Sequence, residues 1–292
     1  MAKVWFITGS SRGLGRSLTE AVLAAGDKVA ATARKPQQLD DLAAKYKDQL
    51  LAVELDVTDR AAVYKSVADT VKHFGRIDVL VNNAGFGVIG AAEAYTDEQF
   101  RSQLDTNLYA PIEVTRAVLP YMRRQRSGFI MQISSVGGRV GNAGLTMYQA
   151  AKFGLGGFSE ALAKEVAPLG IRVTCVEPGG FRTDWAGASM SYAPAVEGYE
   201  ETVGKRIALF QGGTYIPVGD PDKAAKVMVA LADEAQPPVH LVLGSEAIAI
   251  LEKANAIRDE ELAKWTPVSL STDADDADAE KFLSTGFGKS YR

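Results

Sequence analysis

The sequence predicts an α/β protein built on a doubly wound parallel sheet, and three observations support that fold class. Short apolar or β-branched runs alternate with stretches of helical spacing over residues 4–177. The apolar runs are nearly continuous, which is typical of parallel strands buried on both faces. A glycine-rich turn follows the first run and leads directly into the first helical stretch. Right-handed crossovers then predict about seven strands in the order 3-2-1-4-5-6-7.

The individual elements can be placed in order along the chain. Apolar runs predict strands at residues 4–8, 28–33, 50–55, 77–81, 129–134 and 171–177. Apolar residues spaced three or four apart predict helices at residues 14–25, 61–74, 111–126 and 148–168. Gly26 and Gly170 each stand between a helix and the next strand, where glycine commonly ends a helix. Asp59 and Asp97 are expected to be the N-caps of the helices that follow them.

Length and composition bound the domain organisation. A chain of 292 residues corresponds to one or two domains at about 150 residues each. No linker rich in Pro, Gly or Ser divides it, and we find no internal repeat. We therefore expect one large domain over residues 1–245, followed by a C-terminal helical extension and acidic tail over residues 246–292.

Composition also excludes several classes of protein. Hydrophobic residues make up 47% of the chain and charged residues 23%, as in ordinary soluble domains. The net charge of −4 is too mild to indicate a nucleic-acid partner. No apolar run reaches the roughly 18 residues that span a bilayer, and no signal peptide precedes the first strand. The single cysteine, Cys175, cannot form an internal disulfide. We expect a soluble, cytoplasmic protein that does not bind membranes.

Residues 185–213 do not fit the alternating pattern. This segment is rich in Gly, Ala, Ser and Tyr and also carries bulky apolar side chains, including Trp185 and Phe210. Such a segment is either a mobile cover over a ligand or an ordinary surface excursion. We assign it as a substrate lid of the large domain.

The glycine-rich turn reads Thr8-Gly9-Ser10-Ser11-Arg12-Gly13-Leu14-Gly15. It joins a strand to a helix, so the free N–H groups and positive dipole end of that helix face the turn and suit a pyrophosphate. Gly9 permits the tight turn, Gly13 lets the backbone approach the phosphate, and Gly15 allows close helix packing. The turn predicts a dinucleotide site that includes Gly9, Ser11, Arg12, Gly13, Leu14 and Gly15.

The spacing T-G-x-x-x-G-x-G resembles that of the short-chain dehydrogenase/reductase family, in its shorter branch of about one Rossmann domain. Three further motifs resemble that family: Asp56-Val57 after the third strand, Asn82-Asn83-Ala84-Gly85 after the fourth, and Pro178-Gly179 with Thr183 after the sixth. The resemblance covers residues 3–245. It implies that all of these residues contact or support a nicotinamide cofactor, with Thr183 at its carboxamide.

Residues at the end of the second strand favour NADP(H) over NAD(H). A carboxylate there would bind the ribose hydroxyls of NAD and repel a 2′-phosphate. This chain has Ala33 at the corresponding position, followed by Arg34 and Lys35. An arginine can hold a phosphate with two hydrogen bonds, and Arg12 in the turn adds a second cation.

The catalytic residues are expected around Tyr148 and Lys152. These two residues are four apart, so they share one helix face. Ser135 lies 13 residues before Tyr148, which is the spacing of the family's catalytic serine and tyrosine, and Asn107 matches its fourth catalytic position. Tyr148 would act as general acid or base, and Ser135 would hydrogen-bond the substrate oxygen. The resemblance implies that Asn107 orders a water leading to Lys152. We expect Lys152 and an oxidised nicotinamide to lower the pKa of Tyr148 from about 10.

These residues predict an NADP(H)-dependent oxidoreductase that interconverts a hydrophobic ketone or aldehyde and an alcohol. The alternatives are an NAD(H)-dependent alcohol dehydrogenase of the same family and a nucleotide-sensing regulator without turnover. The resemblance further implies a homodimer or homotetramer that assembles through the helices at 111–126 and 148–168. His73 and His240 have no acid or cysteine nearby in sequence, so we predict no metal site. Arg139 and Arg182 either face a charged substrate or lie at the surface.

Overall fold

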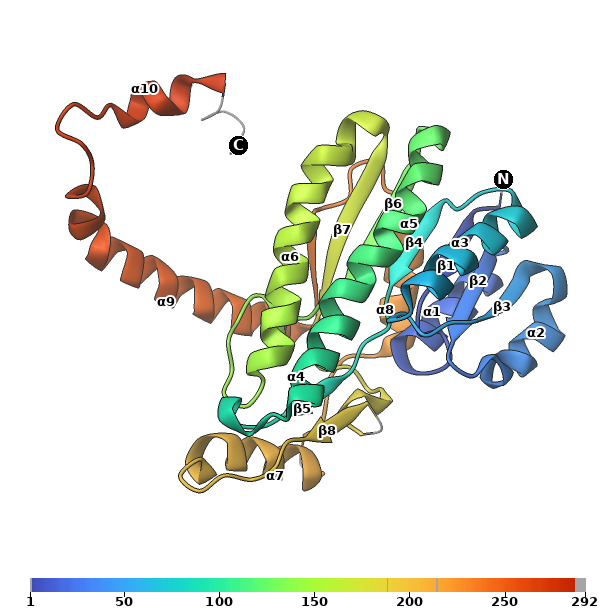
Figure 1. Cartoon of the computed structure of the whole chain (residues 1–292), viewed down its shortest axis with the longest axis horizontal. Helices are drawn as coiled ribbons and strands as arrows, with labels where there is room; N and C mark the ends of the chain where they lie inside the picture. The colour runs from blue at the N-terminus through green and yellow to red at the C-terminus, as the bar shows by residue number, and fades with distance from the viewer. Residues whose placement is uncertain (1, 188, 214, 287–292) are drawn as a thin grey trace. The chain divides into compact units, whose positions relative to one another are not determined.

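A parallel sheet forms the centre of the molecule (Figure 1). The computed structural model describes residues 2–187, 189–213 and 215–286; Ala188 of the predicted lid and residues 287–292 of the predicted tail lie outside them. Within these ranges, seven strands pair in the order β3-β2-β1-β4-β6-β7-β9. Strands β5 and β8 belong to a separate small sheet. When the seven strands of the main sheet are numbered by themselves, their order is the predicted 3-2-1-4-5-6-7.

The strand bounds agree with the prediction to within three residues. The strands are β1 (Val4–Ile7), β2 (Lys28–Ala33), β3 (Leu50–Glu54), β4 (Val79–Asn82), β6 (Gly128–Ile133), β7 (Ile171–Pro178) and β9 (His240–Leu243). The last of these pairs with β7 at the edge of the sheet and was not located from the sequence, because four residues beside a loop carry no clear period.

Helices cover both faces of the sheet. One face carries α1 (Gly13–Ala24), α2 (Asp40–Tyr46) and α8 (Pro221–Leu231), and the other carries α3 (Arg60–Phe74), α5 (Ala110–Gln125) and α6 (Thr146–Val166). Strand β1 shows the alternation that separates the two cores. Trp5 and Ile7 pack into the first core, whereas Phe6 packs into the second. All three are fully buried, which explains the continuous apolar runs in the sequence.

Helix ends follow the expected chemistry with one correction. Asp59 caps α3 as predicted, because its side chain accepts a hydrogen bond from the N–H of Ala62. The prediction for Asp97 is wrong, since Thr96 is the N-cap of α4 (Asp97–Leu104). Thr96 and Gln99 form a reciprocal capping box, in which each side chain accepts a hydrogen bond from the backbone N–H of the other residue. Two N–H groups are satisfied in this way, whereas Asp97 as N-cap would satisfy only one.

The segment predicted as a lid contains regular structure. Strand β8 (Met190–Tyr192) pairs in parallel with β5 (Gly87–Ile89) to form the small second sheet. A π-helical turn (Glu200–Gly204) then leads into α7 (Lys205–Gln211). Three-residue strands show no detectable alternation, so this pairing across about 100 residues of chain is decided by tertiary structure.

The chain divides into two units at Leu251 and Glu252. Helix α9 (Ser245–Leu270) begins in the first unit, and the second unit contains its remainder together with α10 (Ala279–Ser284). None of the helices in the described part of the chain combines the length and the apolar character needed to span a membrane.

The glycines at two helix ends provide a test of this packing. Gly26 and Gly170 both have positive φ, at +88° and +76°, but only at Gly170 would an added Cβ overlap a backbone atom, the carbonyl oxygen of Arg126. We expect Gly26→Ala to lower the free energy of unfolding by about 1 kcal/mol. Gly170→Ala should lower it by about 3 kcal/mol, because the backbone must also move. Urea unfolding measures both variants. Equal losses in the free energy of unfolding for Gly26→Ala and Gly170→Ala would show that the close approach of Gly170 to Arg126 is unimportant.

Candidate functional site

The glycine turn after β1 is shaped by close backbone approaches. Gly9 has φ of +70°, and a Cβ there would lie 3.0 Å from the Cα of Ala84. At Gly15 a Cβ would overlap the carbonyl oxygen of Gly9 and the side-chain nitrogen of Asn83. Glycine at these positions therefore lets the turn pack directly against the end of β4 and against itself. The N–H groups at the start of α1 follow this turn, and a helix N-terminus of this kind can bind a phosphate.

Thr8 and Asn83 hold this turn against the end of β4. The hydroxyl oxygen of Thr8 accepts hydrogen bonds from the N–H groups of Asn83 (2.9 Å) and Ala84 (3.0 Å). The Asn83 side chain donates in return to the carbonyl oxygens of Thr8 (3.0 Å) and Gly9 (3.1 Å). Two of the motifs predicted from sequence therefore form one hydrogen-bonded unit.

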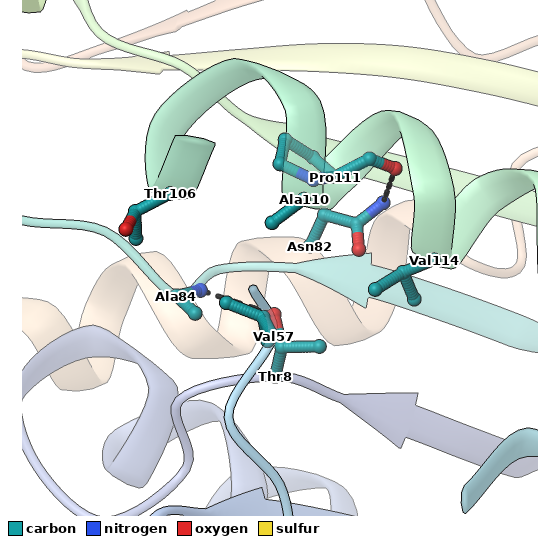
Figure 2. A pocket seen from close by; sticks show the side chains of 8 residues that line it. All are labelled: Thr8, Val57, Asn82, Ala84, Thr106, Ala110, Pro111 and Val114. Carbon is teal, nitrogen blue, oxygen red and sulfur yellow. Dashed lines mark hydrogen bonds between the residues drawn. The ribbon is translucent and has the colours of Figure 1, made fainter. Parts of the chain in front are cut away.

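Asn82 is directed into the protein. Its side-chain nitrogen donates to the carbonyl oxygen of Pro111, to Thr115 and to Gln132, at 2.9–3.1 Å. Figure 2 shows this side chain in a hollow at the ends of β1 and β4. The hollow is lined by Thr8, Val57, Asn82, Ala84, Thr106, Ala110, Pro111 and Val114. Val57, Asn82 and Ala84, which come from two predicted cofactor motifs, thus lie together.

The residues predicted to choose the cofactor lie around the end of β2. Arg12 and Arg34 are both exposed to solvent. Hydrogen bonds from Thr58 lower the pKa of Asp56 below its ordinary value, against the effect of burial and with a smaller contribution from the charge of Arg34. The ionised Asp56 and the cation of Arg34 are therefore close enough to interact. The last residue of β2 is Ala33, so no carboxylate stands at the position where one would select NAD.

Tyr148 and Lys152 lie in the first two turns of α6, and both side chains are buried. The ammonium of Lys152 donates to the carbonyl oxygen of Ile133 at 2.7 Å and lies 5.7 Å from the centre of the Tyr148 ring. Ser135 follows β6, accepts a hydrogen bond from the N–H of Gly137 (3.0 Å), and its side chain interacts with that of Tyr148. The three predicted residues come together at the carboxyl end of β6.

Asn107 completes this group from an unexpected local structure. It lies in a π-helical segment (Asp105–Tyr109) between α4 and α5, a form often found at functional sites. Its side-chain nitrogen donates to the carbonyl oxygens of Phe86 (3.0 Å) and Gln103 (3.1 Å). Its side-chain oxygen is buried without a partner in the structure.

Gly85 lies between Asn107 and Lys152. A Cβ on this glycine would lie 2.7 Å from the side-chain oxygen of Asn107 and 3.8 Å from the ammonium of Lys152. The unpartnered acceptor of Asn107 and the cation of Lys152 therefore face the same small space. A water placed there would satisfy Asn107, as the predicted role requires.

Burial dominates the electrostatics of the catalytic group. Desolvation raises the pKa of Tyr148 to about 12, although the interaction with Ser135 opposes it. Desolvation lowers the pKa of Lys152 to about 8, and only the charge of Cys175 acts in the opposite direction. In the chain alone, the pKa of Tyr148 is therefore raised and not lowered as expected from the sequence, because the desolvation of its own hydroxyl outweighs the interaction with Ser135.

The turn after β7 approaches the glycine turn from the other side. The N–H of Gly179 donates to the carbonyl oxygen of Leu243 (2.8 Å), which fixes the residue after Pro178 against β9. A Cβ on Gly13 would lie 3.5 Å from the Cβ of Thr183, so these two predicted residues are neighbours. The predicted cofactor residues of β1, β4 and β7 thus surround one region at the carboxyl edge of the sheet, where open α/β sheets bind ligands.

An aromatic series covers Tyr148. Ring centroids are separated by 5.6 Å between Tyr148 and Trp185, by 6.2 Å between Trp185 and Phe210, and by 4.9 Å between Phe210 and Tyr215. Met190, Tyr192 and Ile207 of the same segment pack beside them on Ile89 and Leu145. The predicted lid therefore provides an apolar wall next to the predicted catalytic tyrosine.

Arg139 and Arg182, which the sequence placed either facing a charged substrate or at the surface, both have partners in the protein. Arg139 pairs with Glu177 at 3.1 Å, and the guanidinium of Arg182 donates to the carbonyl oxygen of Pro217 at 3.1 Å. The sequence spacing around His240 indicated no acid or cysteine as a metal ligand, but the fold places such residues next to it. Cys175 and Glu177 lie beside it, because β9 pairs with β7 and brings residues 63 and 65 positions apart together. Sequence spacing carried no signal of this contact.

Comparison with known proteins agrees with the fold and the motifs. The sequence model of the short chain dehydrogenase family matches residues 3–192. Oxidoreductase BOA17 of Botryotinia fuckeliana (strain B05.10) is 45% identical over 273 residues, covering 93% of this chain and 100% of that protein. A short-chain dehydrogenase from Streptomyces avermitilis shares 42% identity with a TM-score of 0.89, over 94% of this chain and 100% of that one. The fold also resembles that of ElxO with NADP bound (24% identity, TM-score 0.71, 85% of this chain and 100% of that one).

The chain belongs to the short-chain dehydrogenase family, as the sequence motifs indicated. It is therefore an oxidoreductase of a class that uses nicotinamide cofactors.

The burial of Lys152 predicts a pH-dependent stability. Its pKa is lowered from 10.5 to about 8, so the folded chain binds fewer protons than the unfolded chain between these values. Its contribution to stability is therefore present above pH 10.5 and is lost as the pH falls through 8. Relative to Lys152→Met, the wild type should gain about 2 kcal/mol in the free energy of unfolding between pH 7 and 9.5. Urea titrations at both pH values measure this difference, with Tyr148→Phe as a control that keeps the lysine. Parallel pH profiles for wild type and Lys152→Met would contradict it.

Proposed function

We propose that this protein is an NADP(H)-dependent oxidoreductase that interconverts a hydrophobic ketone or aldehyde and the corresponding alcohol. The observation that carries the proposal is the convergence of Ser135, Tyr148, Lys152 and Asn107 at the carboxyl end of β6, beside the glycine turn. The concave turn at Gly9 and Gly15 and the unpartnered oxygen of Asn107 fit a bound nicotinamide cofactor and its ordered water.

When bound, the cofactor supplies or accepts the hydride. Tyr148 donates a proton to the carbonyl oxygen during reduction and removes it during alcohol oxidation. The hydroxyl of Ser135 donates a hydrogen bond to the same oxygen and stabilises the negative charge that develops there. These roles match their placement, since Ser135 interacts with the Tyr148 hydroxyl in the structure.

Lys152 and Asn107 support the proton transfer. Lys152 binds the ribose hydroxyls and keeps a positive charge close to Tyr148, which favours the phenolate. Burial holds the pKa of Tyr148 at about 12 in the chain alone. A second positive charge near the phenol is therefore needed to lower this pKa toward neutral pH. Asn107 holds a water that connects Lys152 with solvent, which would satisfy its buried side-chain oxygen.

The remaining predicted residues hold the cofactor. Gly9, Ser11, Arg12, Gly13, Leu14 and Gly15 would bind the pyrophosphate, and Asp56 and Val57 would contact the adenine. Asn82-Asn83-Ala84-Gly85 would support the cofactor and the sheet core, and Pro178, Gly179 and Thr183 would lie at the nicotinamide side. Ala33 and the exposed cations Arg34 and Arg12 support NADP(H), because they leave room and positive charge for a 2′-phosphate. The similar fold of ElxO with NADP bound is consistent with this choice.

The substrate has an apolar body next to its carbonyl group. Trp185 and Phe210 extend from Tyr148 as an aromatic wall, which packs in one apolar cluster with Ile89 and Leu145. We assign residues 185–213 as the substrate lid of a catalytic domain over residues 1–245, with residues 246–292 as an extension. Two aromatic side chains are exposed at helices α5 and α6: Tyr109 directly before α5, and Phe153 on α6. Their exposure supports assembly into a homodimer or homotetramer through α5 and α6.

Replacement of Tyr148 by phenylalanine tests the proposed chemistry. Phenylalanine keeps the ring but removes the proton donor, so turnover of aldehydes and ketones should fall by about 10²–10⁴-fold. The dissociation constant of NADPH should change by less than about twofold, because the aromatic wall remains. Turnover is followed as NADPH consumption and binding by fluorescence titration. The matched control is Tyr64→Phe on the exposed side of α3, which should behave as wild type. Full activity of Tyr148→Phe would exclude the mechanism, and no NADPH consumption by wild type with any carbonyl compound would support a sensor.

Replacement of Arg34 by alanine tests the cofactor. Loss of charge-assisted hydrogen bonds to a 2′-phosphate should weaken NADPH about ten- to hundredfold and leave NADH unchanged. Lys65→Ala removes an exposed cation of α3 and serves as the control for net charge. An NADH affinity above that of NADPH in the wild type would instead favour the NAD(H)-dependent alternative.

A further inference from the structure

A group of three metal-ligating side chains lies close enough to Lys152 for the charge of Cys175 to act on it, but none of the three has a role in the proposed chemistry. Within the described residues, the thiol of Cys175, a carboxylate oxygen of Glu177 and a ring nitrogen of His240 lie within 4.8 Å of one another. Cys175 and Glu177 are two residues apart on β7, and His240 pairs with Cys175 from the edge strand β9. All three side chains therefore point to one face of the sheet, the face covered by α6.

Hydrogen bonds fix the orientation of His240. Its Nδ1 lies 2.6 Å from Oε1 of Glu177, and its Nε2 lies 2.8 Å from Oε1 of Glu160 on α6. One ring nitrogen thus faces the cluster, while a carboxylate holds the other. Histidines that bind metals in proteins commonly have this carboxylate partner on their second nitrogen.

Glu177 is oriented in a similar way. It is fully buried, and Arg139 donates to both of its oxygens, at 3.1 Å to Oε2 and at 3.4 Å to Oε1. Oε1 also lies 2.6 Å from His240, so the oxygen more weakly held by the arginine is the one at the cluster. A carboxylate held in this manner can provide one oxygen to a cation without becoming an uncompensated buried charge.

We propose that Cys175, Glu177 and His240 form a binding site for a zinc-like divalent transition-metal ion. Sulfur, nitrogen and oxygen ligands in this combination are those of zinc, and three protein ligands leave the fourth position to water. Tetrahedral zinc requires its ligand atoms to lie about 3.3–3.6 Å apart at bond lengths of about 2.0–2.3 Å. The contact of 2.6 Å between Nδ1 of His240 and Oε1 of Glu177 must therefore widen when the ion binds. Binding releases the thiol proton of Cys175 and the proton that His240 shares with Glu177.

The location of the site defines what the metal would do. His240 is the first residue of β9, so the ion joins the beginning of the edge strand to β7, while Glu160 connects it to α6. The ring of His240 retains 21% of its side-chain exposure and Glu160 retains 61%, so an ion can reach the cluster from that side. The ion would stabilise the sheet edge, since a ligand that binds only the folded chain stabilises it.

Cobalt(II) gives a direct test, because Cys175 is the only cysteine in the chain. Titration of the metal-free, tag-free, full-length protein with Co²⁺ should produce a sulfur-to-cobalt charge-transfer absorption that saturates at one equivalent. The same equivalent should be displaced by Zn²⁺. Zn²⁺ should also raise the melting temperature of the wild type.

Matched variants assign the ligands. Cys175→Ser should lose the charge-transfer band, and His240→Gln should bind at least about tenfold more weakly. Glu160→Gln, at an exposed position, should weaken binding about ten- to hundredfold through the orientation of the imidazole. His73→Gln removes the other histidine of the chain and should bind as wild type. Circular dichroism of each metal-free variant verifies that it is folded.

Two results would overturn the proposal. Absence of the band at stoichiometric Co²⁺ would show that the cluster is an ion-pair network only. Equal zinc binding by wild type, Cys175→Ser and His240→Gln would place the metal on other groups.

Discussion

The hydroxyl group of Thr8 holds together the part of the molecule on which the site depends. It accepts hydrogen bonds from two successive N–H groups after β4, and it lies at the end of β1 where the glycine turn begins. The side chain of Asn83 returns two hydrogen bonds to the carbonyl oxygens of the same turn. Because the two central strands end in one hydrogen-bonded unit, the turn before α1 is held against the end of β4. A glycine turn without this support would offer the same N–H groups in many arrangements.

The proposed catalytic group lies where burial opposes ionisation. Tyr148 and Lys152 are both removed from water, and the pKa of each is displaced in the direction that favours the neutral form. The only hydrogen bond from the Lys152 ammonium among those of the described residues goes to the carbonyl oxygen of Ile133. This arrangement costs stability in the chain alone and becomes favourable only with a ligand that brings polar groups to the lysine. Such strain is expected at a functional site.

The otherwise apolar core between the sheet and α6 contains a second polar group, near enough to Lys152 for the charge of Cys175 to act on it. Glu177 is compensated by Arg139 and His240, and His240 in turn by Glu160. Hydrogen bonds to Cys175 and Glu177 raise the pKa of His240 to about 10, so its ring is protonated at neutral pH in the absence of metal. The short edge strand β9 is thereby held by charge as well as by its ladder with β7. A buried carboxylate without these partners would strongly destabilise this edge.

The sequence by itself determined the fold class and the strand order, and it identified the residues of the proposed catalytic group. These features depend on local patterns: continuous apolar runs, a glycine turn between strand and helix, and a tyrosine and lysine four residues apart on one helix. The tertiary structure alone decided the pairing of β5 with β8, the π-helical turn that directs Asn107, and the burial that displaces the pKa of Tyr148. It also decided the meeting of Cys175, Glu177 and His240. Each of these arises from contacts between segments far apart in the chain, and local periodicity contains no information about such contacts.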